Sequence, residues 1–121
     1  HVKFGDVLID VDNTYACGDT IKVTFQGANP RNDQKINESF LTVEKKSEDG
    51  FSVVKTDGDW ETKFHWKREI GGESTVTLEW NTTTDTELGQ YRMCYHGDHK
   101  MIVRNTPVPF TGCSAIFEIS A

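Results

Sequence analysis

Hydrophobic and polar residues alternate along most of this chain, which is the two-residue period of a β-strand with one buried face. The alternation is clear at residues 21–25 and 76–80, where polar residues separate large hydrophobic ones. Shorter runs of the same kind occupy residues 7–11, 41–43, 51–54, 91–95 and 115–119. Turn residues separate the runs about every 8 to 12 residues, and no helical period interrupts them. The pattern predicts an all-β protein, an immunoglobulin-like antiparallel β-sandwich of about seven to nine strands.

The segment from Asp57 to Trp66 carries the largest aromatic load of the chain. Trp60, Phe64 and Trp66 alternate with charged residues, which predicts a strand that buries all three rings on one face. An Asp-Gly-Asp turn precedes it, in which Gly58 can take the positive φ of a tight turn. We therefore expect a rigid β element with an aromatic interior.

A second local signal is the sequence Leu88-Gly-Gln-Tyr91. It fits the tyrosine corner of immunoglobulin-like domains, in which a tyrosine hydroxyl bonds back to the preceding turn. The inward position two residues later is Met93 rather than cysteine, so the usual disulfide between the two sheets is absent. Cys94, the next residue, is expected to point outward.

Length, composition and charge limit the organisation of this chain and the partners it can bind. The 121 residues predict a single domain, residues 1–121, without linker or repeat. A net charge of −6 and a pI near 5.1 argue against nucleic acid or an anionic membrane as partner. No apolar run reaches the roughly 20 residues of a membrane helix, so no transmembrane segment is predicted. The chain begins at His1 without methionine, and we expect a processed or excised piece of a longer product.

Three cysteines allow at most one internal disulfide. We favour Cys94–Cys113, because the last two strands are expected to be antiparallel neighbours. Cys17 is then a free thiol or forms an intermolecular disulfide with another chain. Glycosylation sequons begin at Asn37 and Asn81. These features together predict a secreted or extracellular protein.

Two groups of residues could bind a metal ion. His96 and His99 flank Asp98, and His1 is a further ligand for such a site, whereas the simpler interpretation is a solvated Gly-Asp turn.

Asp57 and Asp59 have oxygen ligands for a divalent cation, but aspartates at these positions also stabilise a turn. Cys113 and Ser114 have no histidine and acid at a spacing that would indicate nucleophilic catalysis. The sequence contains no HExxH motif and no phosphate-binding loop. The residues alone predict no catalytic site, no metal and no cofactor.

Several segments together resemble one known family, the carboxy-terminal domain of the neutral ceramidases. The resemblance extends in order from Phe4 to about Ile119. The matching stretches are Phe4-Gly-Asp-Val-Leu8, Phe25-Gln-Gly-Ala-Asn-Pro-Arg-Asn32, Phe40-Leu-Thr-Val-Glu44, Asp57-Gly-Asp-Trp-Glu-Thr-Lys-Phe-His-Trp66, Thr77-Leu-Glu-Trp80, Gly89-Gln-Tyr-Arg-Met-Cys-Tyr-His-Gly97 and Phe117-Glu118.

The resemblance implies an immunoglobulin-like sandwich packed on a larger domain that hydrolyses the amide of ceramide. In the family the zinc ion and its ligands lie in that other domain, so the resemblance gives this chain no catalytic residue. The cysteines occupy positions where the family is not expected to have cysteine. The His96–His99 stretch and the residues after it also differ from the family's usual sequence.

The leading hypothesis is a non-catalytic accessory module that docks on a catalytic domain and stabilises it. The alternative for the proposed docking residues is that they only cap the open ends of the sandwich. These residues are Asn29, Pro30, Arg31 and Asn32 in one loop, and Asp57, Asp59, Trp60 and Thr62 in one turn.

A hypothesis of a different class is a free-standing secreted binding or structural protein that is disulfide-linked to another protein chain. A third is a small copper oxygenase that uses His1.

Overall fold

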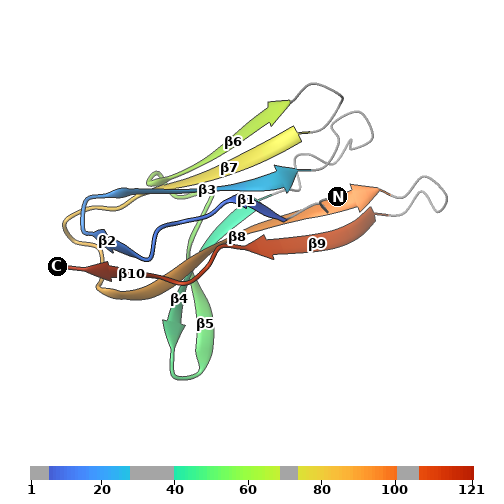
Figure 1. Ribbon diagram of the computed structural model, residues 1–121. Helices are drawn as coiled ribbons and strands as arrows, with labels where there is room; N and C mark the ends of the chain where they lie inside the picture. Colours follow the sequence, from blue (N-terminus) through green and yellow to red (C-terminus); the bar gives the residue numbers. More distant parts are fainter. Residues whose placement is uncertain (1–5, 28–39, 69–73, 101–106) are drawn as a thin grey trace.

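The computed structural model describes residues 6–27, 40–68, 74–100 and 107–121 (Figure 1). These residues form two layers of β-strands and contain no helix, so they hold no helical segment able to cross a membrane. The predicted all-β sandwich is confirmed.

One layer is a four-stranded antiparallel sheet with the order β1-β3-β7-β6. Its strands are β1 (Val7–Ile9), β3 (Thr20–Gly27), β7 (Ser74–Asn81) and β6 (Thr62–Arg68). Strand β3 pairs with β7 over its whole length, and these two strands form the centre of the sheet. Strands β1 and β6 are its edges.

The other layer has six strands in the order β2-β10-β8-β4-β5, with β9 also paired to β8. Its strands are β2 (Thr14–Ala16), β10 (Phe117–Ser120), β8 (Gly89–Lys100), β4 (Phe40–Ser47), β5 (Gly50–Thr56) and β9 (Pro107–Cys113). Strands β10 and β2 run parallel, so the expectation of a purely antiparallel sandwich is wrong at this pair. The described residues hold ten strands rather than seven to nine, because the three-residue strands β1 and β2 are separate.

The core lies between the two sheets. Strands β3 and β7 supply one wall, and β4, β8 and β10 supply the other. All of these side chains are at most 2% exposed: Ile21, Val23, Phe25, Leu41, Val43, Val76, Leu78, Trp80, Tyr91, Met93, Tyr95, Phe117 and Ile119. Burying each large hydrophobic side chain contributes about 1.5 to 3 kcal/mol before the entropy cost of ordering the chain.

The expected aromatic face of residues 60–66 is wrong at both tryptophans. Phe64 packs against the core, but Trp66 is 38% exposed and Trp60 is 80% exposed. The reason is that β6 begins only at Thr62 and forms an edge of its sheet. Trp60 therefore lies in the connection that carries the chain from one sheet to the other. Ile9, expected inward, is likewise 66% exposed, because the register shifts between Val7 and Ile9.

The tyrosine corner is present. The Tyr91 hydroxyl donates a hydrogen bond to the carbonyl oxygen of Glu87 at 2.6 Å. Between them Gly89 has φ of +145°, and a Cβ there would lie 3.0 Å from the Lys45 side chain. Glycine is therefore required at this bend.

Strand β8 changes neighbours along one edge, from β10 at Tyr91 to β9 at Cys94. Ser114 lies in the chain between these partners and compensates for the broken ladder. Its amide donates to the carbonyl of Met93 at 2.8 Å, and its hydroxyl oxygen accepts from the Met93 amide at 3.0 Å. Cys113 ends β9, and the last strand, β10, begins at Phe117.

Replacing this hydroxyl gives the first prediction. Ser114→Ala should lower the free energy of unfolding by about 1 to 3 kcal/mol, because the buried Met93 amide loses its acceptor. Urea unfolding followed by tryptophan fluorescence measures the change. Ser52→Ala, on the exposed surface of β5, should stay within about 0.5 kcal/mol of the parent. Equal effects of the two substitutions would contradict the assigned role of Ser114.

Candidate functional site

The turn between β5 and β6 is closed by its own side chains. The Asp59 carboxylate accepts a hydrogen bond from the Thr56 amide at 2.7 Å. The Thr62 hydroxyl donates to the carbonyl of Thr56 at 2.7 Å, and the Asp59 amide donates to the same carbonyl at 3.0 Å. These contacts use Asp59 and the buried Thr62, so both stabilise the turn. Trp60 and Asp57 are the members of the predicted docking set that the turn leaves exposed.

The turn is at one end of the four-stranded sheet. Thr62 pairs with Trp80 there, whereas Gly27 pairs with Ser74 at the opposite end. The other predicted docking residues follow Gly27 in the sequence and lie outside the described residues; they are Asn29, Pro30, Arg31 and Asn32.

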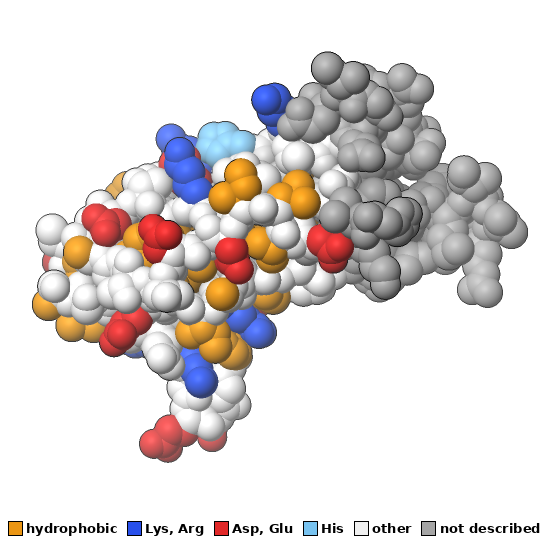
Figure 2. All heavy atoms as spheres, in the orientation of Figure 1, with side chains coloured by type: hydrophobic (Ala, Val, Ile, Leu, Met, Phe, Trp, Pro, Cys, Tyr) orange, Lys and Arg blue, Asp and Glu red, His pale blue; other side chains and the backbone are white. Residues whose placement is uncertain are grey.

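A groove lies beside the turn, between the β4–β5 hairpin and the connection from β7 to β8. Its volume is about 330 Å³, and its walls include Val54, Glu61, Trp80, Asp85 and Tyr91. In Figure 2, hydrophobic side chains gather where this hairpin leaves the body of the molecule, and acidic side chains lie at its tip. The indole nitrogen of Trp80 is buried and has no hydrogen-bond partner among the described residues. A buried donor of this kind favours an acceptor on a bound group or a water.

Two ion pairs border the groove. Lys45 bonds to Glu87, and Lys55 lies 3.1 Å from Glu61. The hydrogen bond with Glu87 raises the pKa of Lys45, and the same contact lowers the pKa of Glu87. Asp85 is a further carboxylate in the wall of the groove, outside these two pairs.

A second group of polar residues lies on the outer face of the six-stranded sheet. Glu44 on β4 accepts hydrogen bonds from Arg92 at 2.9 Å and from the Thr42 hydroxyl at 2.8 Å. The same hydroxyl lies 2.9 Å from Nε2 of His96, whose Nδ1 lies 3.3 Å from the Thr111 hydroxyl. We call this group, together with Cys94 and Cys113, the outer-face cluster.

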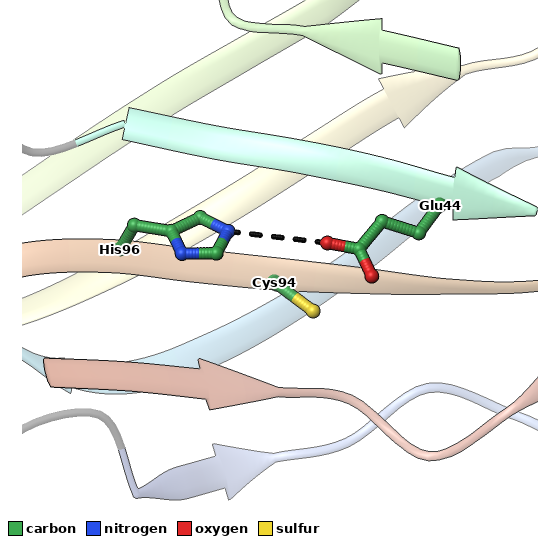
Figure 3. Close-up of side chains that lie close together, drawn as sticks. All are labelled: Glu44, Cys94 and His96. Carbon is green, nitrogen blue, oxygen red and sulfur yellow. Dashed lines mark ion pairs between the residues drawn. The ribbon is translucent and has the colours of Figure 1, made fainter. Parts of the chain in front are cut away.

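The cluster brings together groups that ligate metals. Oxygen of Glu44, sulfur of Cys94 and nitrogen of His96 lie within 4.8 Å of one another. Figure 3 shows the imidazole and the carboxylate pointing toward each other, with the sulfur beside them. Cys94 is bonded to Cys113, however, and a disulfide sulfur is not the thiolate that binds zinc.

The predicted histidine site differs from this cluster. Residues 96 to 99 continue β8 instead of forming a Gly-Asp turn, so that expectation is wrong. His1 and the side chains of Asp98 and His99 lie outside the described part of the structure. Sequence reasoning missed Glu44, because its position beside His96 follows only from the pairing of β4 with β8.

The favoured disulfide, Cys94–Cys113, joins directly paired residues of β8 and β9, whose Cα atoms are 4.0 Å apart. Cys94 faces away from the core, as expected, but the bridge leaves it fully buried. This pairing is within the chain, so an intermolecular disulfide is not supported. The remaining Cys17 is half-buried, and its thiol lies 3.4 Å from the carbonyl oxygen of Thr86.

Of the two sequons, the one at Asn37 lies outside the described residues. Asn81 ends β7 and is half-buried. Its amide nitrogen donates to Glu79 at 2.9 Å, and its oxygen accepts from Thr20 at 2.7 Å. The bond from Asn81 is the main cause of the lowered pKa of Glu79.

The sequence comparisons point to one family. The family model for the C-terminal region of neutral/alkaline non-lysosomal ceramidases matches residues 1–119. Neutral ceramidase B of Dictyostelium discoideum is 40% identical over 118 residues, which are 96% of this chain and 16% of that protein. Neutral ceramidase of Drosophila melanogaster is 34% identical over 98% of this chain and 17% of its own length. The chain thus spans about a sixth of these relatives.

The fold agrees with a solved relative. The crystal structure of neutral ceramidase from Pseudomonas aeruginosa matches 99% of this chain and 20% of its own chain, with a TM-score of 0.85 and 31% identity. A second solved structure, a ceramidase complexed with C2, matches 98% of this chain with a TM-score of 0.84.

The outer-face cluster predicts a pH dependence. Burial lowers the pKa of His96 below its ordinary value of 6.5, and the nearby Glu44 offsets this only in part. The unfolded chain therefore binds this proton more readily than the folded chain, so the free energy of unfolding falls as the pH drops below about 6.5. His96→Gln should flatten this part of the profile.

Urea midpoints measured from about pH 8 to about pH 5 test the expectation. The lowered pKa of Glu79 acts in a separate window, because its stabilising effect is lost only below its ordinary value of 4.5. If His96→Gln and the parent lost stability equally between about pH 7 and about pH 5, a range that includes the ordinary histidine pKa of 6.5, the assignment to His96 would be wrong.

Proposed function

Because the chain belongs to the family of C-terminal domains of neutral/alkaline non-lysosomal ceramidases, we propose that it is a non-catalytic accessory module. In this proposal residues 1–121 form one immunoglobulin-like domain that packs on a ceramide-hydrolysing catalytic domain and stabilises it. The observation that carries the proposal is the match of this whole fold to only 20% of a solved neutral ceramidase. The other four-fifths of such a relative is available for catalysis.

Trp60 is the leading anchor of the docking surface. A tryptophan that is 80% exposed leaves a large apolar area in water, and burial of that area in a partner is favourable. The turn that carries Trp60 is closed by Asp59 and Thr62, so its backbone is already ordered before docking. Pre-organisation of this kind lowers the entropy cost of association.

The groove beside the turn extends this surface. Val54, in the wall of the groove, is 42% exposed. Leu88, which follows the wall residue Glu87 in the sequence, is 51% exposed. Trp80 lines the groove, but its indole nitrogen is buried, so Asp85 is the polar group that a partner would meet there. A cationic side chain there would pair with Asp85. The proposed partner segment is therefore apolar at Trp60 and polar or basic at the groove.

The outer-face cluster supports a structural role for its acid and base groups. Both Glu44 and His96 are tied into one chain of hydrogen bonds with Thr42 between them. Arg92 holds the Glu44 carboxylate as an ion pair at 2.8 Å. Groups held in this way act as a scaffold rather than as a general acid and base exposed to substrate.

The disulfide supports the proposed location. Bridges such as Cys94–Cys113 form and persist in oxidising compartments, and the sequon at Asn81 fits the same route. We therefore propose a secreted or extracellular protein.

Removal of the anchor gives a testable outcome. In the full-length protein, Trp60→Ala should weaken docking by about 2 kcal/mol or more, the loss expected for a buried aromatic anchor. Thermal inactivation of ceramide hydrolysis should occur at lower temperature, and protease should release the domain faster. Ile9→Ala is the matched control, because Ile9 is 66% exposed on β1 at the opposite edge of the sheet.

The same Trp60→Ala substitution in the isolated chain should change its free energy of unfolding by less than about 0.5 kcal/mol, because the side chain lies outside the core. A full-length Trp60→Ala protein as stable as the parent would exclude this docking surface. It would leave the assignment to the family unaffected.

The proposal also predicts the outcome of a direct assay. The purified chain, folded and free of other hydrolases, should leave the amide bond of ceramide intact. Mass spectrometry of the lipid detects any sphingosine that is released. Turnover that scales with the concentration of this chain would overturn the proposed accessory role.

A further inference from the structure

We propose that the outer-face cluster becomes a binding site for a zinc-type cation when the Cys94–Cys113 disulfide is reduced. The four ligands would be the thiolates of Cys94 and Cys113, the imidazole of His96 and the carboxylate of Glu44. This inference is independent of the proposed docking surface, which lies around Trp60 and the groove.

The ligand set is of the type that zinc prefers. Two sulfurs with one nitrogen and one oxygen complete a tetrahedral site, and closed four-ligand sites are typical of structural zinc. Nitrogen, oxygen and the Cys94 sulfur already lie within 4.8 Å of one another, and the Cys113 sulfur is bonded to that of Cys94. Zinc bond lengths require separations of roughly 3.3 to 3.8 Å between ligands, so these three groups would approach one another by up to about 1.5 Å, and the two sulfurs would move apart once their bond is broken.

The reduction and the metal binding balance. A dithiol reductant donates two electrons and two protons to the disulfide, which becomes two thiols, and the reductant becomes a disulfide itself. The cation then binds two thiolates and releases the two thiol protons to solvent. No further reactant is required.

The neighbouring contacts hold the ligands in place. Thr111 bonds to Nδ1 of His96, and Phe40 stacks on the imidazole with 4.8 Å between ring centroids. Nδ1 would carry the proton and donate to Thr111, which leaves the lone pair of Nε2 for the metal. Hydrogen bonds to the ring nitrogen that does not bind the metal fix the tautomer and orientation of ligating histidines.

Neighbouring side chains also hold the Glu44 carboxylate in place. Arg92 holds one of its oxygens at 2.8 Å, and the other oxygen lies 4.0 Å from Nε2 of His96. The Thr42 hydroxyl now joins that second oxygen to Nε2, so the cation would replace the hydroxyl between them.

Charge also favours a divalent cation. Two thiolates and one carboxylate carry three negative charges, which the cation and Arg92 together neutralise. Neutrality matters here because Cys94 is fully buried and Glu44 is only 8% exposed.

Cobalt titration of the chain carrying Cys17→Ser, which removes the third thiol, tests the proposal. After reduction by a phosphine, one equivalent of Co²⁺ should produce thiolate-to-cobalt charge-transfer absorption, and Zn²⁺ should displace it. The oxidised chain should produce no such band. Glu44→Gln and His96→Gln should each weaken Co²⁺ binding by about tenfold or more. The control His65→Gln, on the other sheet, should bind as the parent does.

Circular dichroism recorded in parallel reports folding. Because a four-ligand site contributes to the stability of the fold, the metal should raise the melting temperature of the reduced chain and leave the oxidised chain unchanged. Three results would each overturn the proposal: no charge-transfer band, equal affinity in the Glu44→Gln and His96→Gln variants, or a reduced chain that stays unfolded with the metal.

Discussion

The alternation of side chains along β8 governs both faces of the six-stranded sheet. Tyr91, Met93 and Tyr95 point inward and join the core, whereas Arg92 and Cys94 point outward. A one-residue slip of this strand would exchange the two sets, exposing aromatic rings and burying a guanidinium. The core and the outer-face cluster are therefore fixed by the same register, which β4 imposes on β8 over six paired positions.

Local patterns predicted most of the fold. The period-two runs at residues 21–25 and 76–80 became paired central strands, because each run has one face that only a core can cover. The tyrosine corner was visible because Tyr91 and Glu87 are four positions apart. Trp60 was misplaced, because alternation shows which residues share a face but not where a strand begins or which strand is an edge.

Contacts between distant parts of the sequence could not be predicted in this way. Arg92 and Glu44 are 48 positions apart, and nothing in either segment specifies the other. The cluster appears only when β4 is placed against β8. The disulfide was easier, because its two cysteines are on neighbouring strands connected through 19 positions. The proposed docking surface and the cluster thus differ in origin, the first from one exposed local turn and the second from long-range pairing.

The parallel pairing of β10 with β2 links residues 118–120 to residues 14–16. Strand β10 also completes the core with Phe117 and Ile119. During translation, the early part of the chain must therefore wait for more than a hundred later residues before its sheet can close. A ribosome that stalls before Phe117 would hold a nascent chain with an uncovered hydrophobic interior, which is the form that chaperones bind.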